Sequence, residues 1–338
     1  MVNDIDVVVL WVDGGKEEWI ESYNYYKKKV DPTFSGIEKE RYRDMNTFPY
    51  FFRSIQKYAP WVRKIHLVTD GNFPEWIDIT YEKLNLVSHS DFIPKEYLPT
   101  FNSHTIELNL HRIVGLSDKF VYFNDDHFLN KKTSEDFFFK NNLPVDSFFM
   151  HPNMDNNISS FPFGSIVHND LSIINKNFTK KNVILKNLSK VFNPRYELNA
   201  ILKNIFSIPW SLFYGFNFTH LPQPLLKKTF EDVWDKEFEY LHSCCLEKFR
   251  SANQVNQYLL RYWQLCSGTF IPVTNKKRGL FFNLSSYNID QVIKSLNDSN
   301  VSMLCINDSH ELDDFDRLTE LLINAFKLKF KDKSKFEK

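Results

Sequence analysis

Short apolar runs separated by helix-like segments in the first part of the chain constrain its fold more than any other feature. The run from Asp6 to Trp11 is almost entirely Val and Leu, which is typical of a strand buried on both faces of a parallel sheet. Further strands are predicted at 64–69, 84–89 and 120–123, with helices over 16–29 and 48–58. This alternation predicts a doubly wound α/β sheet.

The alternation fades after residue 140. Residues 141–165 are rich in Asn, Pro and Phe and are predicted to be irregular, whereas 171–210, 230–249, 253–266 and 312–330 are predicted to be mostly helical. No repeat or low-complexity linker marks a boundary. We therefore divide the chain into three parts, 1–140, 141–230 and 231–338.

The charges are balanced overall but not locally. Lys plus Arg and Asp plus Glu number 42 each, which argues against nucleic acid as a partner. From Leu171 to Phe230, however, nine Lys or Arg accompany a single acid, Glu197, among apolar pieces. This segment is either a solvated basic face over a helical core or a contact with an anionic membrane surface or polymer, and the Lys-rich tail after Phe326 could join that contact.

The cysteines and the N-terminal residues indicate the cellular compartment in which the protein is expected. Cys244, Cys245, Cys266 and Cys305 show no zinc spacing, so reduced structural thiols are expected. The first residues carry acids around a short apolar run and no basic leader, and no run approaches the length of a membrane span. These features predict a cytoplasmic protein whose contact with the inner face of the plasma membrane, if any, is peripheral.

The triplet Asn124-Asp125-Asp126 follows the strand predicted at 120–123. Carboxylates just past such a strand face a cleft where α/β proteins hold metals and phosphates, although similar triplets also cap ordinary turns. Upstream, Asn102 or Ser103 can cap a helix running to 116 that carries Glu107, His111 and Arg112. That helix is either an ordinary surface element or brings an acid and a cation to the same sheet edge.

Other candidate residues are ambiguous by themselves. Trp11, Asp13 and Gly14 end the first strand and could contact a nucleotide or form a plain turn. The early arginines Arg41, Arg43, Arg53 and Arg63 suit phosphate oxygens, but they could pair with Asp44 or Asp70 instead. His220 and Arg250 lie far along the chain, and Asn307-Asp308 ends a second strand-like run.

Taken together, these pieces resemble the Stealth family of sugar-phosphate transferases. The resemblance runs in order through IDVVVLWVDGG at 5–15, the segments 41–77 and 98–129 ending in FNDDHFL, HLPQPLLKKTFEDVW at 220–234, FRSANQVNQYLLRYW at 249–263 and LCINDS at 304–309. One departure is visible, because Gln223 stands where the family's animal members have a second histidine. His220 is therefore the sole histidine candidate of that region.

The resemblance implies a Rossmann-like, glycosyltransferase-A-like sheet with a mostly helical insertion or second lobe. In it, 1–140 would bind the nucleotide sugar, 141–230 would be a basic insertion, and 231–338 would complete the active site. The implied reaction transfers a hexose or N-acetylhexosamine 1-phosphate from a UDP-sugar to a glycan hydroxyl, releasing UMP, in capsule or exopolysaccharide synthesis. An ordinary glycosyltransferase that releases UDP and a non-catalytic carbohydrate-assembly protein remain the alternatives.

The family's catalytic residues correspond to Glu107, Asp126, His220 and Arg250. Histidine, whose ordinary pKa lies nearest neutrality, would take the hydroxyl proton, and Arg250 would bind the transferred phosphate. Asp125 and Asp126 would hold Mg²⁺ or Mn²⁺, whereas the part played by Glu107 stays open. The residues expected to bind substrate are Trp11, Asp13, Gly14, Arg41, Arg43, Arg53, Asn102, Arg112, Asn124, Asn307 and Asp308.

Overall fold

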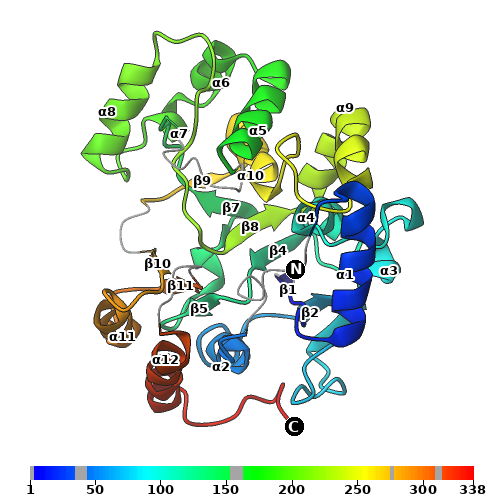
Figure 1. Cartoon of the computed structure of the whole chain (residues 1–338). Coiled ribbons are helices and arrows are strands. Elements are labelled where there is room, and N and C mark those ends of the chain that lie inside the picture. The colour runs from blue at the N-terminus through cyan, green and yellow to red at the C-terminus, as the bar shows by residue number, and fades with distance from the viewer. Residues whose placement is uncertain (1–3, 35–43, 153–162, 275–277, 309–313) are drawn as a thin grey trace.

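The computed structural model describes residues 4–34, 44–152, 163–274, 278–308 and 314–338. A five-stranded sheet with the order β3-β2-β1-β4-β8 lies at its centre (Figure 1). Its parallel strands are β1 (Ile5–Leu10), β2 (Ile65–Thr69), β3 (Leu84–Ser88) and β4 (Lys119–Phe123). The strand β8 (Gln223–Leu226) pairs antiparallel with β4 at the edge. The predicted α/β, Rossmann-like class is therefore confirmed.

Both faces of this sheet are covered, which explains why its central strands β1, β2 and β4 are mostly apolar. Val8 and Tyr122 point into one core, and Val7 and Val121 point into a second core on the opposite face. Successive side chains of a strand alternate between faces, so each strand supplies both cores. The polar residues Asp6 of β1 and His66 of β2 are buried between the helices, with Nε2 of His66 2.9 Å from Oδ2 of Asp6.

Helices from distant parts of the chain cover the two faces. The first core includes residues of α5 (Phe163–Asn177), α9 (Lys227–Leu246) and α10 (Gln257–Ser267), and the second includes residues of α2 (Phe48–Tyr58), α11 (Ile289–Asn297) and α12 (Phe315–Lys329). The helix α1 (Glu17–Val30) packs through Trp19 and Tyr23 against Phe249 in a small separate cluster. The layered arrangement is visible in Figure 1.

Two small sheets and several short helices complete the fold. One sheet joins β5 (His127–Leu129), β11 (Met303–Asn307) and β10 (Gly279–Asn283), and the other joins β6 (Phe139–Lys140), β7 (Leu143–Asp146) and β9 (Ile271–Pro272). The short helices are α3 (His89–Phe92), α4 (Ser103–Asn109), α6 (Lys180–Lys186), α7 (Leu188–Val191) and α8 (Leu198–Ser207). Because β11 pairs antiparallel with β5, the C-terminal part of the chain lies directly behind the turn that follows β4.

One predicted helix is shorter than expected. The helix α4 ends at Asn109 and passes into a 3₁₀ turn, Leu110–Arg112, instead of running to residue 116. The side chain of Asn109 donates a hydrogen bond to the carbonyl of Thr105, which competes with the helical ladder. His111 consequently packs on Phe230 and Trp234 of the core, so it does not share a chemical face with Glu107.

The predictions about cysteines and membrane spans can also be compared with the structure. All four cysteines are free and buried, as expected. Among the described residues, no helix combines the length and apolar character needed to cross a bilayer. The three-part division of the chain stays a prediction, although the pairing of β8 with β4 and of β11 with β5 joins all three parts.

Candidate active site

A tight turn at the carboxyl end of β4 forms the centre of the candidate site. The backbone N–H of Asn124 donates to Nδ1 of His127 at 3.0 Å, and the N–H of His127 donates back to the carbonyl of Asn124 at 3.2 Å. These two bonds close the turn around Asp125 and Asp126. The backbone of Asp126 is fixed as well, because its carbonyl accepts the N–H of Ile306 on β11 at 3.0 Å.

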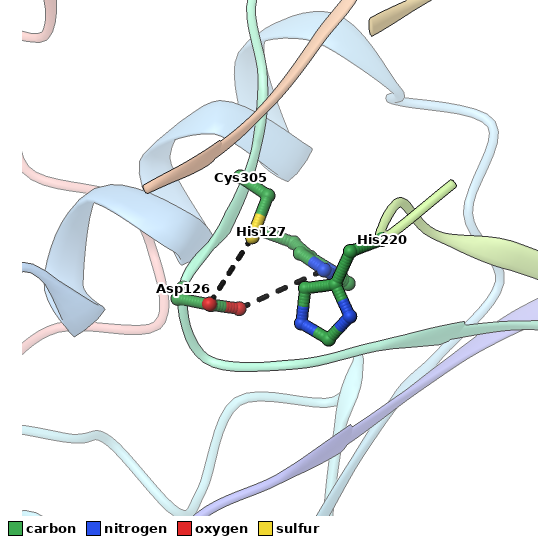
Figure 2. A group of neighbouring side chains, drawn as sticks. All are labelled: Asp126, His127, His220 and Cys305. Carbon is green, nitrogen blue, oxygen red and sulfur yellow. Dashed lines mark hydrogen bonds and ion pairs between the residues drawn. The ribbon is translucent and has the colours of Figure 1, made fainter. Parts of the chain in front are cut away.

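Four side chains from three separate regions meet at this turn. Figure 2 shows Asp126 and His127 facing His220, which precedes β8, and Cys305, which lies on β11. One ligand atom from each of these residues lies within 4.8 Å of the others. The side chain of Asn124 also lies 3.3 Å from Nε2 of His220. Residues more than ninety positions apart in the sequence thus lie together in one cluster.

The donors of this cluster are directed at the Asp126 carboxylate. Burial lowers the pKa of His127 to about 3, so its ring is neutral, and since Nδ1 accepts from Asn124, the ring proton lies on Nε2. That nitrogen is 3.6 Å from Oδ1 of Asp126. Burial, with the nearby charge of Asp126, raises the pKa of the Cys305 thiol, which donates to Oδ2 at 3.1 Å.

Carboxylates gather beside this cluster. Asp125 reaches solvent, yet the surrounding protein raises its pKa to about 7 by desolvation, and the charges of Asp126 and Asp44 add to that effect. Asp44 reaches solvent too, and desolvation by the surrounding protein raises its pKa, with a contribution from the charge of Asp13. Asp44, which lies before α2, is therefore within electrostatic range of Asp13 after β1 and of Asp125 after β4.

This donor set fits a hard divalent cation. Oδ1 of Asp126 is buried and has no hydrogen-bond partner among the described residues, and Asp125 is accessible beside it. Oxygen ligands suit Mg²⁺ and Mn²⁺. The neutral thiol of Cys305 donates to Oδ2 of Asp126, and Nε2 of His127 carries the ring proton without a hydrogen-bond partner among the described residues. Neither atom offers a lone pair to a metal in this arrangement.

Glu107 and Arg250 form the second half of the site. Glu107 lies on α4 and is buried, and its carboxylate accepts from the hydroxyl of Tyr122 and the N–H of Gln257, each at 3.3 Å. Desolvation raises its pKa to about 7, and the charge of Arg250 and the hydroxyl of Ser103 oppose that shift. Arg250 itself donates to Oγ of Ser103 at 2.6 Å. Ser103 thus links the guanidinium to the buried acid.

The two halves of the site are neighbours. The pKa of Tyr122 is raised by burial first and then by Glu107, with smaller influences from Arg250 and Asp125. Tyr122 is the residue of β4 that lies two positions before Asn124. The strand therefore carries the electrostatic link between the Glu107 pair and the Asp126 cluster.

Several residues expected to bind substrate are used structurally instead. Arg53 forms a two-pronged ion pair with Glu337 at 2.6 and 2.9 Å and donates to the carbonyl of Phe330, so it fastens the C-terminal tail to α2. Asn102 is the N-cap of α4 and accepts from the N–H of His104. Arg112 is exposed, bonded to Asn109 and stacked over Trp234 at 4.9 Å.

Of the remaining residues expected to bind substrate, some lie at or just after the ends of β1 and β11, and two lie outside the described residues. Trp11 lies at the end of β1, where its ring stacks on Phe48. Asp13 accepts the N–H of Gly15 in the turn that contains the buried Gly14, and Asn307 ends β11, bonded to Asn283, with Asp308 next to it. Arg41 and Arg43 lie outside the described residues.

The structure also brings in residues that the sequence patterns did not identify. These are Asp44, Tyr122, His127, Asp170, Gln257 and Cys305. Asp170, on α5, is buried and its pKa is raised well above the usual range by desolvation, and it lies within electrostatic range of Glu107. An acid inside the apolar helix FGSIVHNDLSIINKN was the available signal.

Known proteins similar to this chain were found by three comparisons. Residues 41–146 match the family model described as Stealth protein CR2, conserved region 2. The capsular polysaccharide phosphotransferase WcwK of Streptococcus pneumoniae is 41% identical, with 100% of this chain and 99% of the relative covered. The receptor polysaccharide phosphotransferase WefC of Streptococcus gordonii is 38% identical, with 100% of both chains covered.

Two further known proteins are similar to this chain. The exopolysaccharide phosphotransferase cps2G of Lactiplantibacillus plantarum is 38% identical, with 99% of this chain and 96% of the relative covered. Among solved structures, the galactosyltransferase LgtC in complex with donor and acceptor sugar analogues aligns with a TM-score of 0.38 at 9% identity, covering 94% of this chain and 95% of LgtC. From the relatives that match over nearly their whole length, we conclude that this chain belongs to the Stealth family, together with these bacterial polysaccharide phosphotransferases.

Proposed function

We propose that this protein transfers a hexose or N-acetylhexosamine 1-phosphate from a UDP-sugar to a hydroxyl group of a glycan, in capsule or exopolysaccharide synthesis. The observation that carries the proposal is the meeting of two halves at one sheet edge: Asp126 with His220, and Glu107 with Arg250. The relatives named as polysaccharide phosphotransferases support the same class of reaction.

The proposed step forms one bond and breaks one. The acceptor oxygen bonds to the β-phosphorus, and the bond from that phosphorus to the bridging oxygen breaks, so that UMP leaves with the bridging oxygen and a phosphodiester remains. The hydroxyl proton passes to His220. Its Nε2 already faces a donor, the amide of Asn124 at 3.3 Å, and the acceptor hydroxyl would take that donor's place.

Negative charge develops on the phosphoryl oxygens during this step. Arg250 is the guanidinium that we propose to bind the transferred phosphate, because a planar fork suits phosphate oxygens. Asp125 and Asp126 are the residues that we propose to hold Mg²⁺ or Mn²⁺, which supplies charge neutralisation on the diphosphate. Trp11 and Asp13, at the end of the neighbouring strand, are our candidates for contacts with the nucleotide.

Glu107 fits a positioning role better than a catalytic one. Only 5% of the residue is exposed, and its two oxygens accept from Tyr122 and Gln257. It reaches Arg250 through electrostatic attraction and through Ser103. We therefore propose that Glu107 orients the guanidinium of Arg250, and that Arg250 itself contacts the substrate.

Product analysis tests the proposed reaction. Purified protein would be incubated with a panel of UDP-sugars, Mg²⁺ and a glycan acceptor, and the nucleotide and glycan products would be identified by mass spectrometry. UMP together with a glycan gaining a sugar phosphate is the expected result. Release of UDP would instead identify an ordinary glycosyltransferase, and glycan binding without any nucleotide release would favour a non-catalytic assembly protein.

A further inference from the structure

The helix α8 has its polarity reversed relative to a normal surface helix. Its buried positions are Ala200, Asn204 and Ser207, whereas Leu198, Leu202, Ile205 and Phe206 are exposed. Leu198 is 71% and Phe206 67% exposed. The hydrophobic effect favours the opposite arrangement, so these four exposed side chains contribute little burial to the fold, whereas Ala200 and Ile201 pack against the first core.

The exposed apolar residues continue on both sides of α8. Of the 22 large hydrophobic residues that are exposed in the described part of the chain, nine fall within residues 185–212. They are Leu185, Leu188, Leu198, Leu202, Ile205, Phe206, Ile208, Trp210 and Leu212, which we call the 185–212 surface. Figure 1 shows α6, α7 and α8 together at the outer edge of one lobe. Such a concentration marks an interaction site more often than chance exposure does.

Polar bonds hold this surface in place from behind. The side chain of Asn204 accepts the N–H of Met150 and donates to the carbonyls of Phe148 and Val191. Behind the end of α8, the buried ammonium of Lys180 donates to three backbone carbonyls, those of Ser207, Trp210 and Leu212, at 2.6, 3.1 and 3.3 Å. The carbonyl end of a helix favours a cation. The segment is therefore a built element and not a loose loop.

The charges around this surface are mostly positive. Lys181, Lys186, Arg195 and Lys203 are exposed in and around it, and Glu197 is the one acid between residues 178 and 218. A second copy of the chain docked through the same face by two-fold symmetry would bring these cations against their counterparts. Anionic lipid head groups would complement them, and the exposed Trp210 suits the interface between head groups and acyl chains.

From this combination we propose that the 185–212 surface docks on an anionic membrane, with α8 lying in the interfacial plane and its apolar side chains entering the lipid. The membrane contact expected from the sequence is thereby assigned to particular residues. This assignment does not rest on the reaction proposed above. The C-terminal tail is a different case, because Phe330 and Phe336 are buried and Glu337 is bound by Arg53. We therefore assign the contact to the 185–212 surface alone.

Vesicle cosedimentation with the full chain tests the proposal. Vesicles of phosphatidylglycerol and phosphatidylcholine would be compared with vesicles of phosphatidylcholine alone, at low and high salt. The variant is Leu202→Gln with Phe206→Gln, and the matched control is Leu321→Gln with Leu328→Gln on α12, where both leucines are also exposed. We expect binding to the anionic vesicles that salt weakens, a loss of at least tenfold in the partition coefficient for the variant, and no change for the control.

Three results would overturn the proposal. The first is wild-type protein that stays in solution with anionic vesicles, and the second is a variant that partitions as the wild type does. The third is a wild-type dimer in lipid-free solution, measured by light scattering, that the Leu202 and Phe206 substitutions convert to monomer, since a second copy would then occupy the surface. Neither readout needs turnover, so a failure here is separable from a failure of the proposed reaction.

Discussion

Asp170 and Glu107 accept hydrogen bonds from two consecutive backbone amides, those of Asn256 and Gln257, at 3.2 and 3.3 Å. These amides begin α10, so two buried carboxyl groups share the positive end of one helix dipole. Burial nevertheless raises the pKa of both acids. The start of α10 thus binds both Glu107, the acid beside Arg250, and Asp170, an acid from the middle part of the chain.

This pairing predicts how stability depends on pH. The pKa of Glu107 rises from 4.5 to about 7 on folding, so the stability from its neutral form is present at low pH and is lost as pH rises through 7. Asp170 acts in the same direction. The unfolding free energy of the wild type should therefore fall between pH 5 and pH 7.5. In the variant Glu107→Gln with Asp170→Asn, this fall should be smaller than in the wild type by on the order of 2 kcal/mol. Urea unfolding at several pH values measures this, and parallel profiles would contradict it.

Substitutions at the centre of the site should strongly lower turnover without unfolding the protein. Asp126→Ala, His220→Ala and Arg250→Ala should each lower kcat by about a hundredfold or more, because each acts where charge or a proton moves in the transition state. The rate of UMP release measures this effect.

Matched controls for these substitutions lie on exposed helix surfaces. Asp316→Ala, His168→Ala and Arg317→Ala change the same residue types at exposed positions of α12 and α5, and their rates should equal the wild-type rate. A folded Asp126, His220 or Arg250 variant with near-normal turnover would remove that residue from the mechanism.

Metal binding should depend on the turn after β4. Mn²⁺ binding followed by electron paramagnetic resonance should weaken by at least tenfold in Asp125→Asn and in Asp126→Asn, because each loses a charged oxygen ligand. Chelation should also stop UMP release, and added Mg²⁺ should restore it. Unchanged Mn²⁺ affinity in both variants would place the cation elsewhere.

Cys305 should act as a hydrogen-bond donor and not as a nucleophile or ligand. Cys305→Ser keeps a donor for Asp126, whereas Cys305→Ala leaves the carboxylate oxygen without it, which costs about 1 kcal/mol or roughly a fivefold loss in rate. The serine variant should therefore be the more active of the two in steady-state assays. Equal rates would show that the thiol contributes only packing.

Arg53 should contribute to stability and not to substrate binding. Arg53→Gln breaks the ion pair with Glu337, whose side chain is 5% exposed, and should lower the unfolding free energy by about 1 to 3 kcal/mol. The KM for the UDP-sugar should stay at the wild-type value. A raised KM with unchanged stability would return Arg53 to the substrate site.

The central sheet could be predicted from the sequence because the apolar runs in its strands indicate that they are buried. The strands β1 and β4 each carry four consecutive apolar residues, and β2 is apolar at three of its five positions, so the double covering is encoded locally. The strand β8 could not be predicted in the same way, because Pro224 within it argues against a central strand. That proline is tolerated because β8 lies at the edge of the sheet.

The site was predictable only in part for a related reason. The turn Asn124–Asp126 is a local signal, and the structure places Asp126 beside His220. The partners of Glu107 are not local, because Gln257 and Arg250 lie about 150 residues away in sequence. Nothing in the spacing of the arginines distinguished Arg53, which binds the C-terminal tail, from a phosphate ligand.

The pairing of β11 with β5 has a consequence for protein synthesis. The carbonyl of Asp126 and its carboxylate are held by Ile306 and Cys305, which the ribosome adds about 180 residues after Asp126 itself. A nascent chain therefore displays Asp126 long before the strand that fixes it has emerged. The turn that carries Asp126 should therefore reach its final geometry only near the end of translation.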